Sequence, residues 1–226
     1  GEVDRRAEAS AERLRALEAS GCLGPGALDP ARDCGPPQGE GELLPPPEVV
    51  ERQNVDVAYP GCQAGIEGDG ITRCEIGAPR ETAERTIALV GDSHTTQWFP
   101  AFDELGRERG WHVVTYAKAS CPFTAAERLL PDEQTDAATR GCHAWGQAVL
   151  DEILDSDVSF VVTAAFSAAY EWRAPDGTRL ADPGPDGFAA MWSALTAEGI
   201  EVFPIADVPR TQGENVPNCL AAHRDR

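Results

Sequence analysis

Short apolar runs alternate with segments of helical periodicity over the last two-thirds of the chain. Runs bounded by polar residues and glycine are typical of buried strands, and apolar positions three or four residues apart are typical of helices. The sequence predicts strands at 86–90, 111–117, 160–165 and 201–206, and helices at about 95–109, 142–155 and 184–198. Alternating strands and helices favour a parallel sheet with helices on both faces. Right-handed crossovers then predict an α/β fold, a three-layer flavodoxin-like α/β/α sandwich.

The first third of the chain has a different pattern. Residues 4–19 have Ala7, Leu14 and Leu17 at helical spacing, and this stretch ends at Gly21. Residues 22–61 are rich in Pro and Gly, which predicts an irregular arm, and residues 62–80 predict a second looped segment. We therefore expect an N-terminal helix (1–20), a Pro/Gly-rich, disulfide-held extension (21–84) and an α/β domain (85–226).

The turn after the first predicted strand carries the strongest candidate for chemistry. Gly91, Asp92 and Ser93 follow the apolar run, and a helix is expected next. The first and third strands are neighbours at the switch point of such a sheet, where ligands bind. Ser93 could be a nucleophile whose oxyanion is stabilised by backbone N–H groups. Alternatively, it could simply cap the helix.

The charge of the chain excludes one class of partner. Lys and Arg number 19 against 38 Asp and Glu, which gives a formal net charge of −19. Such a surface repels phosphate backbones, so we expect no nucleic-acid partner.

Cysteines indicate the compartment. The chain has 7 cysteines and 4 histidines, with no Cys-x-x-Cys spacing, so no metal site is expected. The cysteines fall in local pairs, which predict disulfides Cys22–Cys34, Cys62–Cys74 and Cys121–Cys142 in an oxidising, extracytoplasmic compartment. Cys219 remains, either as a free thiol or with a partner beyond Arg226.

Several motifs resemble a known family. Gly91-Asp92-Ser93-His94 resembles the first block of the SGNH/GDSL hydrolase superfamily. The longer string 88–94, with Gln97-Trp98 and Pro100-Ala101 after it, is similar to the SGNH domain fused to acyltransferase-3 family membrane O-acyltransferases. Further matches are 118–122 (Lys-Ala-Ser-Cys-Pro), Cys142-x-x-Trp145 and the arm residues 22–28. The resemblance covers most of residues 20–220.

The resemblance implies an activity. It makes Ser93 the nucleophile of a two-step O-acyl transfer through a serine ester. The acyl group, expected to be acetyl, would come from a membrane-delivered donor and pass to a cell-wall or surface carbohydrate. No bound cofactor is expected. The resemblance also implies a membrane acyltransferase domain fused upstream, and an extracytoplasmic location tethered to the membrane.

The chain departs from the superfamily pattern in its acid and base. SGNH enzymes carry both in an Asp-x-x-His block after the fifth strand, and no such block occurs in these 226 residues. Only four strands of the domain are predicted, so we expect the sequence to end before that block, and a fragment without it could be inactive. His94 and Asp92 are expected to support the turn. The other histidines (His112, His143, His223) are expected to be poor substitutes for the base.

The oxyanion hole has several candidate members. The Ser93 backbone N–H is the first, and the second is expected from Ala119 or Ser120 after the second strand. The superfamily's asparagine has no match after the third strand. Thr163 or Ser167 could supply a hydroxyl there or be purely structural. Tyr170 and Trp172 are candidates for a wall that binds the carbohydrate acceptor.

Three functions therefore remain open. The first is extracytoplasmic O-acyl transfer to a glycan, and the second is a secreted carbohydrate O-acetyl esterase that uses water as acceptor. The third is a non-catalytic glycan-binding SGNH-like domain, which takes the missing acid and base at face value.

Overall fold

The computed structural model describes residues 2–22, 29–34, 58–129, 136–166, 170–173, 178–180, 184–208 and 215–223. The chain divides into two compact units, one of residues 1–54 with 210–226 and one of residues 55–209. The first unit contains the helices α1 (Glu2–Ala19) and α8 (Val216–Ala222) and the disulfide Cys22–Cys34. Most of the predicted irregular arm lies outside the described residues.

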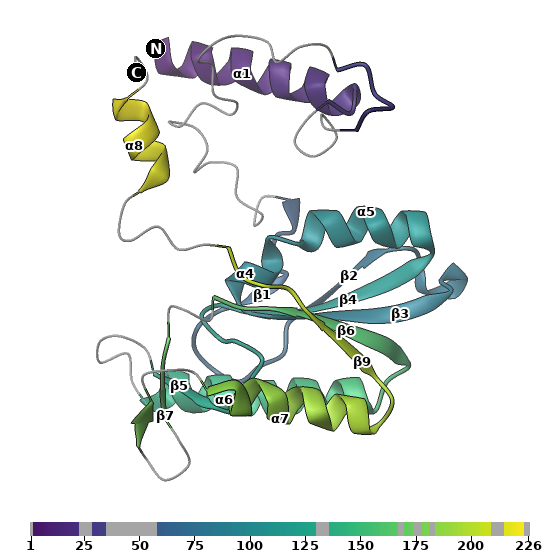
Figure 1. The fold of residues 1–226 in the computed structure, drawn as a ribbon, viewed down its shortest axis with the longest axis vertical. Helices are drawn as coiled ribbons and strands as arrows, with labels where there is room; N and C mark the ends of the chain where they lie inside the picture. The colour runs from purple at the N-terminus through teal and green to yellow at the C-terminus, as the bar shows by residue number, and fades with distance from the viewer. Residues whose placement is uncertain are drawn as a thin grey trace. The chain divides into compact units, whose positions relative to one another are not determined.

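The second unit is built on a mainly parallel, six-stranded sheet (Figure 1). Its four consecutive parallel strands are β3 (Arg85–Gly91), β4 (Trp111–Lys118), β6 (Val158–Ala164) and β9 (Glu201–Pro204), in the order β4-β3-β6-β9 with β9 at the edge. β3 pairs in parallel with β4 and with β6, which confirms the adjacency of the first and third predicted strands. The flavodoxin-like prediction therefore describes the core of the sheet.

Two strands that the sequence did not reveal complete the sheet. β1 (Gln63–Ala64) pairs in parallel with the end of β4, and β2 (Arg73–Gly77) pairs antiparallel along the rest of it. The boundary expected at residue 85 thus differs from the structure, where residues of the expected extension join the sheet. β1 is 2 residues long and β2 is half exposed, so neither produces a recognisable apolar pattern.

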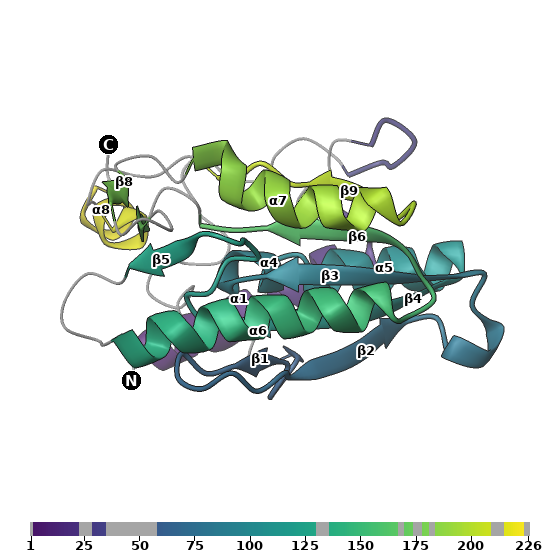
Figure 2. The same cartoon turned by 90° about the horizontal axis from the view of Figure 1, so that it is seen from below.

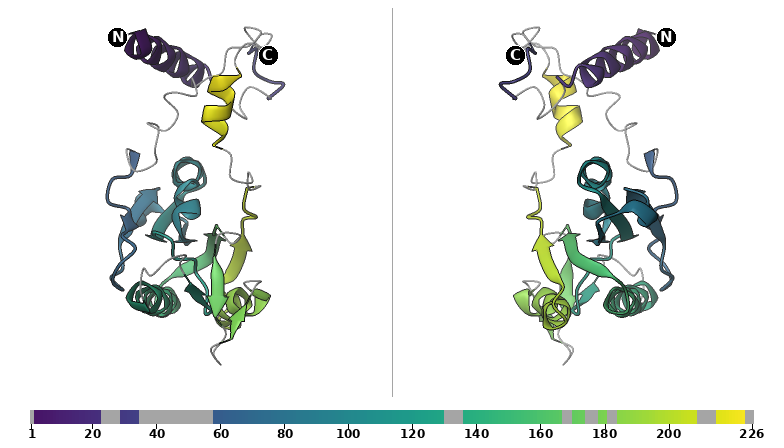
Figure 3. Two further views of the ribbon diagram at one scale, coloured as in Figure 1. Left: turned by 90° about the vertical axis from the view of Figure 1, so that its left-hand side faces the viewer. Right: turned by 90° about the vertical axis from the view of Figure 1, so that its right-hand side faces the viewer.

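Helices cover both faces of the sheet. α5 (Phe99–Arg109) lies on one face, and α6 (Asp136–Leu154) and α7 (Gly184–Ala197) lie on the other (Figures 1 and 3). Figure 2 shows α6 and α7 running along the strands. The short elements are η2 (Arg80–Thr82) and α4 (Ser93–Thr96). α6 begins 6 residues before the expected start at 142, because its first turn and a half lacks large apolar residues.

The core consists of two layers that follow from the alternation of β3. Ile87 and Leu89 belong to the cluster that contains Phe99 of α5. Ala88 and Val90 belong to the cluster that packs against α6 and α7. All four are fully buried, because both faces of a parallel sheet are covered by helices.

A second, small sheet lies outside this pattern. β5 (Glu127–Leu129), β7 (Glu171–Arg173) and β8 (Arg179–Leu180) pair antiparallel in that order. Its strands are 2 or 3 residues long, too short for a periodic signal in the sequence. The sheet nevertheless buries two large side chains, Arg128 and Trp172, completely.

All three predicted cysteine pairs are disulfides in the structure. Cys62–Cys74 joins the segment before β1 to β2, and Cys121–Cys142 joins the turn after β4 to α6. Cys219 is a free, exposed cysteine among the described residues. Cys62–Cys74 thus crosslinks the segments of the two strands that pair with β4 on its outer side, and Cys121–Cys142 fixes the turn at the end of β4.

Removing the Cys121–Cys142 crosslink should destabilise the second unit. We expect the double variant C121A/C142A to lose about 3 kcal/mol of unfolding free energy, because the unfolded chain regains the freedom of the closed loop. All 5 tryptophans lie within 55–209, so fluorescence in a denaturant titration reports this unit alone. The matched variant C22A/C34A, in the other unit, should leave the transition in place. An unchanged midpoint in C121A/C142A would contradict the prediction.

Candidate active site

Ser93 is the first residue of α4, directly after β3 and its N-cap residue Asp92. Its side chain is exposed, whereas Asp92 beside it is completely buried. β3 lies between β4 and β6, so this turn stands at the carboxyl edge of the sheet where the flanking loops converge. The structure therefore presents a solvent-accessible hydroxyl on a buried turn.

Gly91 and Thr95 attach this turn to the neighbouring strand β6. Gly91 has φ +152°, and a Cβ at that position would overlap the carbonyl oxygen of Ala164 and the hydroxyl of Thr95. The Thr95 hydroxyl is fully buried, 2.6 Å from the Ala164 carbonyl oxygen and 3.2 Å from that of Val90. A side chain at residue 91 would separate the turn from β6, which explains the glycine.

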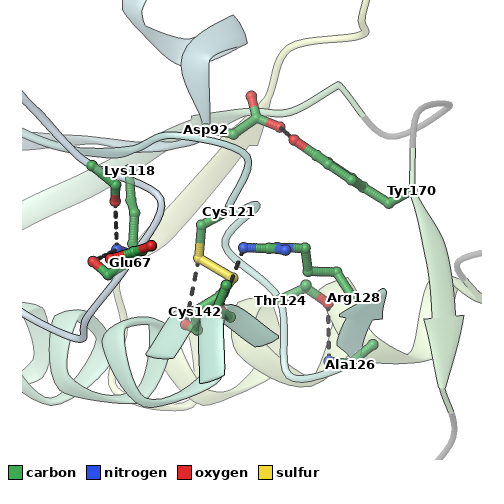
Figure 4. The surroundings of a disulfide bond; sticks show 11 residues. Glu67, Asp92, Lys118, Cys121, Thr124, Ala126, Arg128, Cys142 and Tyr170 are labelled. Atoms are coloured by element: carbon green, nitrogen blue, oxygen red, sulfur yellow. Dashed lines mark hydrogen bonds between the residues drawn. A yellow bond between two sulfur atoms is a disulfide. The ribbon is translucent and has the colours of Figure 1, made fainter. Parts of the chain in front are cut away.

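Asp92 holds the turn through three hydrogen bonds. Its Oδ1 accepts the His94 backbone N–H at 2.8 Å. Its Oδ2 accepts the Phe166 backbone N–H at 2.8 Å. The same oxygen accepts the Tyr170 hydroxyl, also at 2.8 Å (Figure 4). Burial raises the pKa of Asp92, and the three hydrogen bonds act in the opposite direction. Asp92 is thus committed to connecting the Ser93 turn with the segment after β6.

His94 forms a pair with Asp207 that the sequence did not reveal. The His94 Nδ1 lies 2.6 Å from Asp207 Oδ1, and the two side chains are 18% and 15% exposed. The His94 ring stacks on Phe166 with centroids 4.3 Å apart and planes 7° apart. Asp207 follows β9, 113 residues from His94. The sequence does show a carboxylate, Asp207, directly after the fourth predicted strand. That His94 is its partner depends on which strands are neighbours in the sheet.

The described residues do not complete a Ser-His-Asp triad. No hydrogen bond joins the Ser93 hydroxyl to a histidine in the part of the chain that the structure describes. His112 is buried in β4, with Nδ1 3.2 Å from the Ala78 carbonyl oxygen. His143 lies on α6, and His223 is the C-cap of α8 in the other unit. The described geometry leaves the base unassigned.

The turn after β4 distinguishes the two candidates for the second oxyanion donor. The Ala119 N–H donates to the Ala64 carbonyl at 2.9 Å. Because this N–H already has an acceptor, the expectation that Ala119 serves the oxyanion hole is corrected. The Cys121 N–H donates to the Lys118 carbonyl at 3.2 Å and closes the turn. Ser120, with φ +50°, has no acceptor for its N–H among the described residues. Ser120 is therefore the donor that this turn can supply.

Thr163 and Ser167 were the two candidates for an oxyanion hydroxyl from the third predicted strand and the residues after it. Thr163 is buried within β6 between Val90 and Pro204, and no described contact joins it to Ser93. Ser167 lies outside the described residues.

Tyr170 and Trp172 do not form the expected wall for the acceptor. Trp172 is fully buried in β7, so its ring cannot stack on a sugar. Tyr170 directs its hydroxyl inward to Asp92, and burial raises the pKa of that hydroxyl. Arg128, which interacts electrostatically with Tyr170, is 1% exposed, and burial lowers its pKa. The sequence placed both aromatic residues near the crevice but could not show that they face the interior.

Two further properties concern metals and membranes. Within the described ranges, no group of three or more His, Cys, Asp or Glu side chains is arranged to hold a metal ion. No helix in the described part of the chain is long and apolar enough to cross a membrane.

Comparison with known proteins gives one match. Residues 61–226 match the family model described as "SGNH domain (fused to AT3 domains)". The match extends over well more than half of the chain and includes the turns of Ser93 and Ser120. No curated protein and no solved structure matches the chain.

The contact between Asp207 and His94 predicts the tautomer of the imidazole. A carboxylate at Nδ1 favours the form that carries a proton there, so we expect His94 to be Nδ1-protonated when neutral. In Asp207→Ala the Nε2-protonated form should gain population, as measured by nitrogen-15 NMR of the imidazole. The His112 signals, with Nδ1 at the Ala78 carbonyl, should stay unchanged in the same spectrum. Identical His94 spectra in both proteins would contradict the pairing.

Proposed function

The chain belongs to the SGNH domain family found fused to AT3 domains, whose members are typically esterases or acyltransferases, and on this basis we propose that Ser93 is the nucleophile of O-acyl transfer. The observation that carries the proposal is the turn itself. An exposed serine hydroxyl stands on a rigid strand-turn-helix, and its own N–H has no acceptor among the described residues.

The proposed chemistry proceeds in two steps. The Ser93 Oγ attacks the carbonyl carbon of an acyl ester, and the donor alkoxide leaves with a proton. The N–H groups of Ser93 and Ser120 stabilise the negative oxygen of the tetrahedral intermediate. A second hydroxyl then attacks the acyl-serine and releases Ser93. The resemblance implies that a histidine from an Asp-x-x-His block moves the protons, and no such block occurs in these 226 residues.

We assign the acyl group as acetyl and the acceptor as a cell-wall or surface carbohydrate. The family's fusion to AT3 domains supports a membrane acyltransferase partner that delivers the acyl group. Three disulfides support an oxidising, extracytoplasmic location for the domain, tethered to the membrane through that partner. The acyl donor is a substrate, and the proposal needs no bound cofactor.

Hydrolysis is the second candidate. The Ser93 side chain is exposed, so water can reach an acyl-serine as readily as a sugar hydroxyl can. An esterase would share the nucleophile and the oxyanion donors and differ only in the acceptor.

The assignment of Ser93 predicts a trapped intermediate. Incubation of the full-length protein with p-nitrophenyl acetate should release p-nitrophenol and add one acetyl group to the peptide that contains Ser93, as measured by mass spectrometry. Ser93→Ala should lose both signals, because the neighbouring hydroxyls of Thr95 and Thr96 are buried. Ser193→Ala, an exposed serine on α7, is the matched control and should behave as the parent protein.

The same experiment separates the two acceptors. With oligosaccharide present, acetylated sugar at the expense of acetate supports the transferase, and acetate alone supports the esterase. Unchanged p-nitrophenol release by Ser93→Ala would refute the nucleophile itself.

A further inference from the structure

We propose that Asp207 is a positioning residue, which acts through the side chain of His94 to hold the Ser93 turn in the orientation that acyl transfer requires. The proposal rests on the proposed function, because it assigns a role within the same reaction. In this role Asp207 contacts no reacting atom. It lies in the segment after β9 and reaches the turn through one hydrogen bond to the imidazole.

Ser93 depends on its two neighbours in the chain for its position. In the part of the chain that the structure describes, its hydroxyl makes no hydrogen bond, and its carbonyl accepts the Thr96 hydroxyl at 2.7 Å from within the same short helix. On one side, Asp92 is completely buried and held by its own hydrogen bonds. On the other side, the backbone of Ser93 is therefore as well fixed as His94 is.

His94 is fixed at its backbone, at one face of its ring and at one ring nitrogen. Its N–H donates to Asp92 Oδ1 at 2.8 Å, and its ring stacks on Phe166 with centroids 4.3 Å apart. Its Nδ1 lies 2.6 Å from Asp207 Oδ1, and the imidazole is the donor because a carboxylate has no proton to give. These three partners follow β3, β6 and β9, so three strands converge on one side chain.

The hydrogen bond to Asp207 supplies a restraint that the stacking cannot. The planes of His94 and Phe166 are 7° apart, which fixes the plane of the imidazole but leaves it free to turn within that plane. A hydrogen bond at Nδ1 fixes this remaining direction, because it depends on the angle at the donor as well as on distance. Asp207 therefore decides the direction in which the imidazole points.

Asp207 is itself anchored to the sheet and to the backbone. The Ile205 N–H donates to the Thr163 carbonyl at 2.8 Å, which extends the pairing of β9 with β6 beyond Pro204. The Val208 N–H donates to Asp207 Oδ1 at 2.9 Å. One carboxylate oxygen thus accepts both from the imidazole and from the following backbone. The contact joins an anchored segment after β9 to the Ser93 turn.

The first test is Asp207→Ala in the full-length protein. We expect kcat for p-nitrophenyl acetate to fall by about tenfold to a hundredfold with KM unchanged, because a displaced nucleophile is penalised in the transition state. The matched control is Glu75→Ala, which removes another carboxylate beside a histidine, 3.7 Å from His112 Nε2 in the same unit. It should keep kcat within about twofold. Equal kcat values in Asp207→Ala and Glu75→Ala would overturn the proposal.

Asp207→Asn separates the hydrogen bond from the charge. Its amide oxygen can still accept from the imidazole, and the Val208 N–H favours the oxygen rather than the NH2 group at that position. We expect Asp207→Asn to recover most of the kcat that Asp207→Ala loses. If Asp207→Asn is as slow as Asp207→Ala, the hydrogen bond is not what holds the turn, and the proposal is wrong.

His94→Phe tests the same link from the other side and covers a folding failure of Asp207→Ala. It keeps a ring that can stack on Phe166 and removes Nδ1, so it should lower kcat by a similar factor. In H94F/D207A the two losses should not multiply, because both variants break one hydrogen bond. Losses that multiply would overturn the proposal. If Asp207→Ala does not fold, a parental kcat in His94→Phe overturns it.

Failure of this proposal is distinguishable from failure of the proposed function. If Ser93→Ala is inactive while Asp207→Ala and His94→Phe are both fully active, the nucleophile stands and the positioning role is wrong. If Ser93→Ala turns over substrate at the parent rate, the proposed function is wrong and the measured kcat belongs to another group.

Discussion

The turn that carries Ser93, the proposed nucleophile, depends on one buried carboxylate. Asp92 is removed from water, which costs free energy for a charged group unless every lone pair finds a donor. Three donors from two segments surround it, namely the N–H groups of His94 and Phe166 and the hydroxyl of Tyr170. Because the carboxylate needs all of them, the Ser93 turn and the segment after β6 cannot move independently. Ser93 can therefore be exposed to solvent while the hydrogen bonds of the buried Asp92 side chain hold its backbone in place.

The parallel sheet brings the polar residues that follow its other strands to the same edge as this turn. Ser93 follows β3, Ser120 follows β4, Tyr170 follows β6 and Asp207 follows β9. The carboxyl ends of parallel strands share one edge, so segments far apart in sequence meet there. Helices on both faces bury most of β3, β4 and β6. The loops at the carboxyl edge are exposed enough to carry polar side chains without the cost of burying them.

The same arrangement supports the acyl transfer that we propose for the domain. The N–H groups of Ser93 and Ser120 belong to two neighbouring turns, each held by contacts that do not involve substrate. Donors fixed before the reaction need no reorganisation when charge develops on the oxygen. The His94 ring, held by Asp207 on one nitrogen and by Phe166 on one face, adds a further rigid element beside Ser93.

The sequence by itself determined the order of strands and helices, the cysteine pairs and the place of Ser93. These features are local or depend on regular topology: apolar runs mark β3, β4 and β6, and each disulfide closes a short loop. Elements of 2 or 3 residues, such as β1 and β8, carry too little pattern to be read. The small sheet and the inward direction of Trp172 were therefore missed.

Only the tertiary structure decided which polar groups meet. The pairing of His94 with Asp207, the use of the Ala119 N–H by Ala64, and the inward turn of Tyr170 all involve partners from separate segments. A sequence specifies each donor and acceptor, but not which of them lie within 3 Å, because a hydrogen bond depends on distance and direction in space. The fold could thus be predicted from residue patterns, and the geometry around Ser93 could not.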